Sequence, residues 1–294
     1  MNILFLIGSD LYSYNMANEI CIKFGQTQFK ASFLVFKNEL AFKPEKIHED
    51  IRQLIFYERT LFSEALIPFL KNHRNEGKYV GLDTLVQKYA INYAFCPFID
   101  NKNASQFILE QANIWKIDVV ISIRCIVKLD AQLIHYFTRS NEHYLWNVHP
   151  GLLPKYRGIM PMFAAMLNQE QHYGITLLRI SEQLDEGSII DSRTCDLDYT
   201  QSMMQNILDL IPAGVELVTT NLLKLSRKEP LSALVQNATD TGFYSFPTEE
   251  ELELFKARGL RLYSKEELIN VMKSCYLTDN QKDIVEQLLH YTGQ

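Results

Sequence analysis

Three side chains of this chain have the types needed for acyl transfer to an amine: an amide, an imidazole and a carboxylate. Asn147 and His149 lie two residues apart in the run Asn-Val-His-Pro-Gly-Leu-Leu-Pro-Lys-Tyr-Arg-Gly, and Asp185 follows within Leu-Asp-Glu-Gly. An attacking amine creates negative charge on the acyl oxygen and must lose a proton. The Asn147 amide can donate to that oxygen. His149 is suited to take the proton, and Asp185 can orient the imidazole.

The segment after His149 is built to be stiff. Pro150 and Pro154 restrict the backbone, and Gly158 permits an unusual dihedral angle. A stiff loop would hold Asn147 and His149 in register, which matters because small misplacements of catalytic groups cost large rate factors. Arg157 is expected to pair with a carboxylate or simply to brace the loop.

Each of the three side chains also has an ordinary structural interpretation. A histidine at a strand end is usually just hydrogen-bonded, and an isolated asparagine is more often a turn residue. Asp185 precedes Glu186-Gly187, a sequence that by itself indicates a turn. Their occurrence together with the Leu-Leu-Pro-x-Tyr-Arg-Gly run favours the functional interpretation.

The elements that position these side chains alternate between strands and helices. The pattern predicts strands over residues 2–7, 31–36, 91–95, 118–123 and 144–148, and helices over 15–24, 51–69 and 105–115. Such alternation is typical of an α/β, Rossmann-like fold with a mostly parallel sheet covered by helices. His149 then ends a strand, at the edge where open α/β sheets bind their ligands.

The second half of the chain continues this pattern. We expect a helix over residues 159–167 with Pro161 in its first turn. A strand pair over 174–180 and 188–195 would carry Asp185 in its connection. Residues 201–225 read as one long helix with a kink at Pro212.

The residues after Glu229 read as short helices packed on the main body. Thr248-x-x-Glu251, Ser264-x-x-Glu267 and Thr278-x-x-Gln281 are three capping-box patterns, and Gly259 is placed to end the first helix. We therefore expect a catalytic domain over residues 1–228 and a small helical C-terminal extension over 229–294. The extension could dimerise the protein, cover an acceptor pocket or cap the sheet.

Bulk composition argues against several classes of partner and site. The net charge of −6 argues against nucleic acid as the main partner. Five cysteines without a Cys-x-x-Cys pair favour neither zinc nor disulfides, so we expect no metal and a reducing, cytoplasmic location. The apolar run at the N-terminus is too short for a membrane span, and no membrane association is expected.

The run from Asn147 to Gly158 resembles the signature of the formyltetrahydrofolate-dependent formyltransferases. Asp185 falls where that family keeps its catalytic aspartate, and the family's Gly-x-Thr pattern is present as Gly174-Ile-Thr176. The resemblance extends over residues 118–225. It implies a formyltransferase fold, 10-formyltetrahydrofolate as co-substrate, and Asn147, His149 and Asp185 as the catalytic trio.

The resemblance also implies where the folate co-substrate binds. One wall would be Ile126, Val127, Lys128 and Leu129, mainly through their backbone groups, and the other would be Ile180, Leu184 and Glu186.

Three residues depart from the family pattern. Gly151 stands where many members have serine, and Arg124 and Cys125 replace small or aromatic residues beside the pocket. A Gly-x-Gly-x-x-Gly motif is absent, so a dinucleotide is not expected.

The acceptor is less well specified by the sequence. Methionyl-tRNA formyltransferases carry a C-terminal β-barrel of about a hundred residues, whereas the tail here is shorter and reads as helical, which favours a small-molecule amine such as an amino sugar nucleotide. The alternatives are a methionyl-tRNA formyltransferase without the usual barrel, a formyltetrahydrofolate hydrolase, and a non-catalytic folate- or nucleotide-binding module. A homodimer is also compatible with the sequence.

Overall fold

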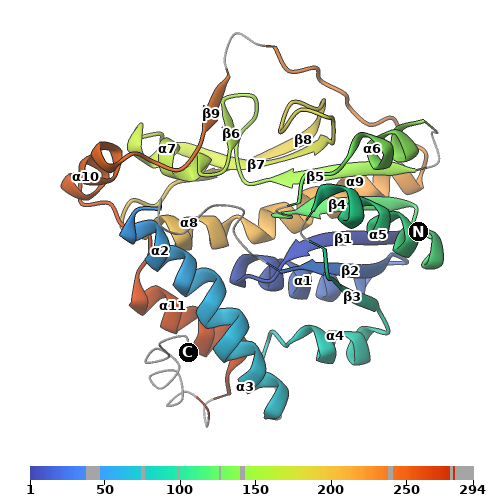
Figure 1. Cartoon of the computed structure of the whole chain (residues 1–294), viewed down its shortest axis with the longest axis horizontal. Coiled ribbons are helices and arrows are strands. Elements are labelled where there is room, and N and C mark those ends of the chain that lie inside the picture. Colours follow the sequence, from blue (N-terminus) through green and yellow to red (C-terminus); the bar gives the residue numbers. More distant parts are fainter. Residues whose placement is uncertain are drawn as a thin grey trace.

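A seven-stranded sheet in the order β3-β2-β1-β4-β5-β7-β8 forms the centre of the molecule (Figure 1). The computed structural model describes residues 1–37, 47–73, 77–98, 100–125, 127–139, 143–237, 241–278 and 281. The strands are β1 (Asn2–Gly8), β2 (Lys30–Phe36), β3 (Asn92–Cys96), β4 (Val119–Ile123), β5 (Tyr144–His149), β7 (His172–Arg179) and β8 (Ile189–Asp196). The first five are parallel, β7 runs antiparallel to β5, and β8 pairs antiparallel with β7 and so has the direction of the first five. The predicted fold class is confirmed.

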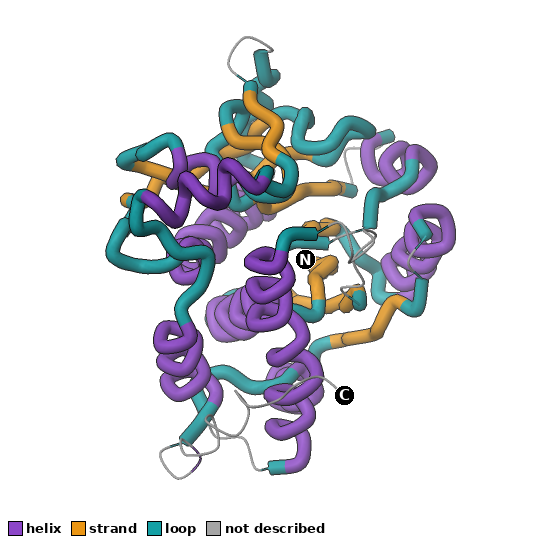
Figure 2. The backbone as a smooth tube through the Cα atoms, turned by 60° about the vertical axis from the view of Figure 1, so that its left-hand side comes forward, coloured by secondary structure: helices purple, strands orange, loops and turns teal. Residues whose placement is uncertain are grey.

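Helices cover both faces of this sheet, which explains why its central strands are continuous apolar runs. Along β1, Ile3, Phe5 and Ile7 pack into a large core with helices α1 (Leu11–Phe24) and α9 (Ile211–Ser226). Leu4 and Leu6 face a smaller core with α5 (Asn101–Ile114) and α6 (Ala131–Thr138). Figure 2 shows the strands between a smaller and a larger group of helices.

The predicted helices of the first half are present with shifted bounds. Helix α1 begins before residue 15 because the Asp10 carboxylate caps it, accepting from the Ser13 N–H at 2.9 Å. The helix expected over 51–69 is a continuous rod of α2 (Glu49–Ile55), the π-helical η2 (Phe56–Leu66) and α3 (Ile67–Asn72). The pattern gave no signal for α4 (Leu82–Tyr89) or α6.

The prediction of one helix over 201–225 is wrong. The structure has α8 (Met203–Asp209) and α9, separated at Leu210. Pro212 lies in the first turn of α9, where its missing N–H leaves no intrahelical bond unmade. Proline therefore begins a new helix here instead of bending an existing one.

The described part of the tail contains α10 (Glu249–Ala257), α11 (Lys265–Val271) and the π-helical η4 (Met272–Tyr276). It also contains a strand that the pattern did not predict: β9 (Gly242–Tyr244) pairs in parallel with β6 (Tyr156–Gly158) as a separate small sheet. Helix α7 (Pro161–Leu167) follows β6. The division of the chain at residue 228 remains a prediction.

The three capping-box patterns have different outcomes. The Thr248–Glu251 box is fully formed, and Gly259 follows α10 with φ +75°. Ser264 accepts from the Glu267 N–H, but the Glu267 carboxylate binds Ser202 instead of closing the box. In the third, the Thr278 N–H donates to the Gln281 side-chain oxygen at 3.2 Å, and the helix expected after it lies outside the described residues.

Candidate active site

Asn147, His149 and Asp185 converge at the carboxyl edge of the sheet. Asn147 and His149 come from the end of β5, and Asp185 lies in the connection from β7 to β8. The Asn147 Nδ2 donates to Asp185 Oδ1 at 3.4 Å, and the His149 Nδ1 lies 3.5 Å from the same oxygen. His149 is 4% exposed and Asp185 7% exposed. The amide and the imidazole, two residues apart on β5, thus both reach one oxygen of a carboxylate that lies much further along the chain.

The backbone of β6 holds the two titratable groups of this cluster from the opposite side. The His149 Nε2 lies 2.6 Å from the Tyr156 carbonyl oxygen, and the Gly158 N–H donates to Asp185 Oδ2 at 3.0 Å. A carbonyl oxygen only accepts, so Nε2 carries the proton in this contact. The lone pair of Nδ1 in the neutral ring therefore faces the Asp185 carboxylate. The sequence pattern had not singled out Tyr156, because its contribution is a backbone oxygen.

The turn after His149 is fixed by a network through Thr176. The Gly151 N–H donates to the His149 carbonyl at 2.8 Å, and the Thr176 hydroxyl donates to the Gly151 carbonyl at 2.6 Å. A Cβ at residue 151 would lie 2.6 Å from both the His149 Nε2 and the Tyr156 carbonyl oxygen. The glycine at this departure from the family pattern therefore allows the close contact between ring and carbonyl.

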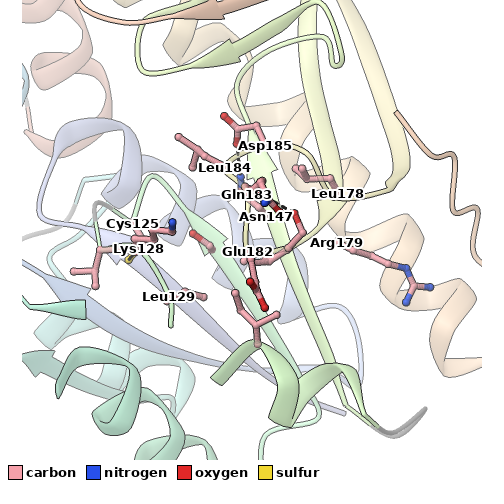
Figure 3. Close-up of a pocket in the computed structure, with 16 residues that line it drawn as sticks. Cys125, Lys128, Leu129, Asn147, Leu178, Arg179, Glu182, Gln183, Leu184 and Asp185 are labelled. Atoms are coloured by element: carbon pink, nitrogen blue, oxygen red, sulfur yellow. Dashed lines mark hydrogen bonds between the residues drawn. The ribbon is translucent and has the colours of Figure 1, made fainter. Parts of the chain in front are cut away.

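A pocket opens beside the trio, between two loops above the ends of β4, β5 and β7 (Figure 3). Of the residues predicted for its walls, Val127, Lys128 and Leu129 line one side, and Ile180 and Leu184 line the other. Asn147 and Asp185 also line the pocket. In Figure 3 the Arg179 side chain points away from it.

Three predicted site residues have other positions. His149 lies behind Asp185 and does not line the pocket. Glu186 does not line it either, since its carboxylate pairs with the Arg157 Nη1 at 2.6 Å. Ile126 lies outside the described residues.

Cys125 lies on the pocket wall as a neutral thiol. Burial raises the pKa of the Cys125 thiol to about 12, although its Sγ also lies 3.9 Å from the Val127 carbonyl. Since the thiolate is the nucleophilic form, this cysteine is not activated for covalent chemistry.

Arg124, the other departure beside the pocket, has a different environment. Its guanidinium pairs with Glu58, lies 4.0 Å from Asp10 Oδ1 and stacks 5.5 Å from the centre of the Tyr12 ring. Burial by itself would lower the pKa of Arg124, but the Glu58 and Asp10 carboxylates raise it above its usual value. Arg124 therefore joins the ends of β1 and β4 to helix η2.

The described residues contain neither a metal-binding cluster nor a helix suited to span a membrane. No group of three or more histidine, cysteine, aspartate or glutamate side chains among them is arranged to hold a metal ion. No helix in the described ranges has the length and apolar character required to cross a bilayer.

Comparison with known proteins places a recognised domain over the site. Residues 80–210 match the formyl transferase family model. The methionyl-tRNA formyltransferase of Fervidobacterium nodosum is 28% identical over 158 residues, which cover 48% of this chain and 50% of that protein. The chain spans half or less of the length of the curated relatives it matches.

Solved structures share the fold at low sequence identity. Glycinamide ribonucleotide transformylase 1 from Symbiobacterium toebii superposes with a TM-score of 0.55 at 12% identity, covering 80% of this chain and 94% of that one. An N-formyltransferase from Helicobacter canadensis, in complex with folinic acid and dTDP-3-aminofucose, gives a TM-score of 0.52 at 18% identity, covering 83% and 71%. The resemblance stated from the sequence motifs is confirmed.

Proposed function

Since residues 80–210 carry a formyl transferase domain, we propose that the protein is an N-formyltransferase. It moves a formyl group from 10-formyltetrahydrofolate to a primary amine of a small-molecule acceptor. The observation that carries the proposal is the convergence of Asn147, His149 and Asp185 within 3.5 Å contacts beside a pocket.

In the proposed reaction the acceptor amine attacks the formyl carbon. The carbon–oxygen double bond becomes a single bond to an oxyanion, and the attacking nitrogen becomes positively charged. Collapse of this intermediate breaks the bond to the folate nitrogen, which leaves with one proton. The products are a formamide and tetrahydrofolate, so the proton lost by the amine balances the proton gained by the leaving nitrogen.

Asn147 is assigned the role of oxyanion donor. Its amide lines the pocket and donates to Asp185 only across 3.4 Å, a long contact that a better acceptor can replace. A donor aimed at developing negative charge is the usual means by which an enzyme stabilises such an intermediate.

His149 and Asp185 are assigned to the proton. Asp185 stands between the pocket and the imidazole, so we propose that its carboxylate receives the ammonium proton and shares it with the His149 Nδ1. The protonated ring would then have both N–H groups directed at acceptors, the carboxylate and the Tyr156 carbonyl. The same proton returns to the folate nitrogen as it leaves.

The pocket walls fit the folate-type donor. Val127 and Leu129 on one side and Ile180 and Leu184 on the other supply apolar surface for a flat ring. We propose these residues, with Lys128, as the folate site. The bound folinic acid of the Helicobacter canadensis protein supports the class of ligand. Glu186 would contribute through its pairing with Arg157 and not by direct contact.

For the acceptor we propose an amino sugar nucleotide. The dTDP-3-aminofucose bound by the Helicobacter canadensis protein supports this choice, and the net charge of −6 gives no general attraction for tRNA. The curated relatives named methionyl-tRNA formyltransferase keep tRNA as the alternative acceptor.

The test is tetrahydrofolate release from 10-formyltetrahydrofolate with a panel of amines: amino sugar nucleotides, free amino sugars, amino acids and charged initiator tRNA. We expect release to depend on a nucleotide-linked amino sugar and to be lost in His149→Ala. Release of formate at full rate without any amine would identify a hydrolase. Equal activity in His149→Ala would remove the proposed catalytic role of this site.

A further inference from the structure

The connection that carries Asp185 is held in place by a segment of the tail. We call this the tail segment: residues 231–237 and 241–244. Resting on the proposed function, we propose that Gln236 of this segment is the positioning residue for Asp185. Figure 1 shows the segment, in orange, running from α9 towards β9.

Gln236 binds the Asp185 connection through both hydrogens of its amide. The Nε2 donates to the Asp185 carbonyl at 2.8 Å and to the Gly187 carbonyl at 2.7 Å. The Gln236 Oε1 is buried without a hydrogen-bond partner, so these two carbonyls set the orientation of the amide. A primary amide has two N–H donors on one nitrogen, which suits two neighbouring carbonyl oxygens.

The connection held by Gln236 is exposed at its start and contains one residue in a left-handed conformation. Glu182, Gln183 and Leu184 are exposed, whereas Asp185 and Gly187 are buried. Asp185 has a φ of +58°, a left-handed conformation that costs a non-glycine residue roughly 1 kcal/mol. The two carbonyls bound by Gln236 belong to the strained residue itself and to Gly187, the two buried residues of the connection.

Other contacts of the tail segment anchor Gln236 and the partners of the trio. Leu234 and Ile189 exchange two backbone hydrogen bonds of 2.8 and 2.9 Å, which fix the segment on β8 just after the Asp185 connection. Strand β9 pairs with β6, whose Tyr156 carbonyl and Gly158 N–H contact the trio. A Cβ at Gly158 would lie 2.4 Å from the Tyr244 carbonyl oxygen, so this pairing is close. The tail segment therefore reaches the trio from both sides.

The test compares Gln236→Glu with Asn237→Asp in the full chain. Both replace an amide by a carboxylate in the same segment, but Asn237 is exposed. In Gln236→Glu, a carboxylate oxygen that cannot donate takes the place of the amide nitrogen and faces the Asp185 and Gly187 carbonyls. We expect Gln236→Glu to lower kcat roughly tenfold or more with a folate KM within about twofold, since misplaced catalytic groups affect turnover more than binding. Asn237→Asp should leave both unchanged.

Two readouts separate positioning from general destabilisation. In an Asp185→Ala background, Gln236→Glu should lower the residual rate by less than about twofold, because residues acting through one group are not additive. Amide hydrogen exchange at Gly158, whose N–H donates to Asp185, should be several-fold faster in Gln236→Glu. Gln236→Ala removes the donors without adding charge and replaces the glutamate variant if that variant does not fold.

Different results overturn the two proposals. A wild-type protein that transfers no formyl group contradicts the proposed function. In that case the rate of amide hydrogen exchange at Gly158, compared between wild type and Gln236→Glu, still tests whether Gln236 positions the Asp185 carboxylate. Full kcat in Gln236→Glu and Gln236→Ala contradicts the positioning role. An equal loss of rate with and without the Asp185 carboxylate contradicts it too.

Discussion

Two polar clusters lie at the carboxyl edge of the same sheet, and they differ in how completely their groups are paired. Arg124, after β4, pairs directly with Glu58 and lies 4.0 Å from Asp10, after β1. In the trio, Asp185 Oδ1 accepts from Asn147 at 3.4 Å and lies 3.5 Å from the His149 Nδ1. The first cluster has its cation paired with its own carboxylates, whereas the second has hydrogen-bonding capacity left for a ligand.

Buried polar groups that stabilise the fold can therefore be distinguished from buried polar groups that are free to contact a reacting ligand. Asp10 also accepts from the N–H and the hydroxyl of Ser13, so it caps α1 as well as facing Arg124. Its oxygens are occupied by structural contacts. The trio borders a pocket, and its long contacts can be exchanged for contacts to a reacting group. Variants in the two clusters should therefore fail in different assays.

The largest expected effect is on turnover in the trio. His149→Ala and Asp185→Ala should each lower kcat by about 10²–10⁴-fold, because each removes a participant in proton transfer. Folate affinity should change only modestly, since the pocket walls remain. Steady-state kinetics measure both quantities. A loss confined to KM, with kcat intact, would mean that these residues bind substrate without taking part in the chemistry.

The complementary variant is Arg124→Met, which removes the cation shared by Glu58 and Asp10 and leaves Glu58 with the longer 3.9 Å contact to Arg59. Breaking one partner of a buried ion pair costs about 3–5 kcal/mol, so the free energy of unfolding should fall by that order. Denaturant titration measures it, with the exposed Arg139→Met as control. If Arg124→Met kept its stability but lost activity, the cluster would be functional and the contrast between the two clusters would disappear.

Gly151→Ala sharpens the comparison within the trio. The added methyl group would contact the His149 Nε2 and the Tyr156 carbonyl at 2.6 Å, so the ring must move. We expect a destabilisation of about 1–3 kcal/mol from overpacking, with kcat reduced beyond any loss of folded protein. Thermal unfolding and kinetics on the same sample separate the two effects. Unchanged kcat would show that the contact between ring and carbonyl is dispensable.

The smallest effect is expected at Glu170, which braces Tyr156 from outside the site. Hydrogen bonds from Lys155 and Tyr156 lower the pKa of Glu170. A lowered pKa in the folded state contributes stability above the unfolded pKa, and this is lost as pH falls through the folded pKa. Glu170→Gln should therefore destabilise by less than about 1 kcal/mol at pH 7 and match the wild type in acid. Urea titrations across pH 2–7 measure the free energy of unfolding of both proteins. A stability difference between them that persisted in acid would show that the effect does not come from the charge of Glu170.

Much of the fold and the three central residues could be predicted from sequence because the signals are local. The apolar runs of β1, β4 and β5 mark buried parallel strands, and His149 is the last residue of one of them. The helix break at Leu210 could not be distinguished from a kink, since proline is compatible with both a bent helix and a new first turn.

The parts that sequence missed depend on partners far along the chain. Strand β9 has three residues, too few for an alternating pattern, and exists because β6 is available to pair with it. Gln236 contacts a carbonyl 51 residues away through a side chain that is common on surfaces. The Tyr156 oxygen is a backbone atom and carries no residue-type signal.

The central claim is that Asn147 and Asp185 border the place where the formyl group reacts. The most direct test is a crystal structure with folinic acid bound. We expect its pterin ring between Val127–Leu129 and Ile180–Leu184, with its formyl group roughly 3–3.5 Å from Asn147 or Asp185, the separation of a reactive arrangement. Folinic acid bound elsewhere, with the pocket empty at saturating concentration, would contradict the account.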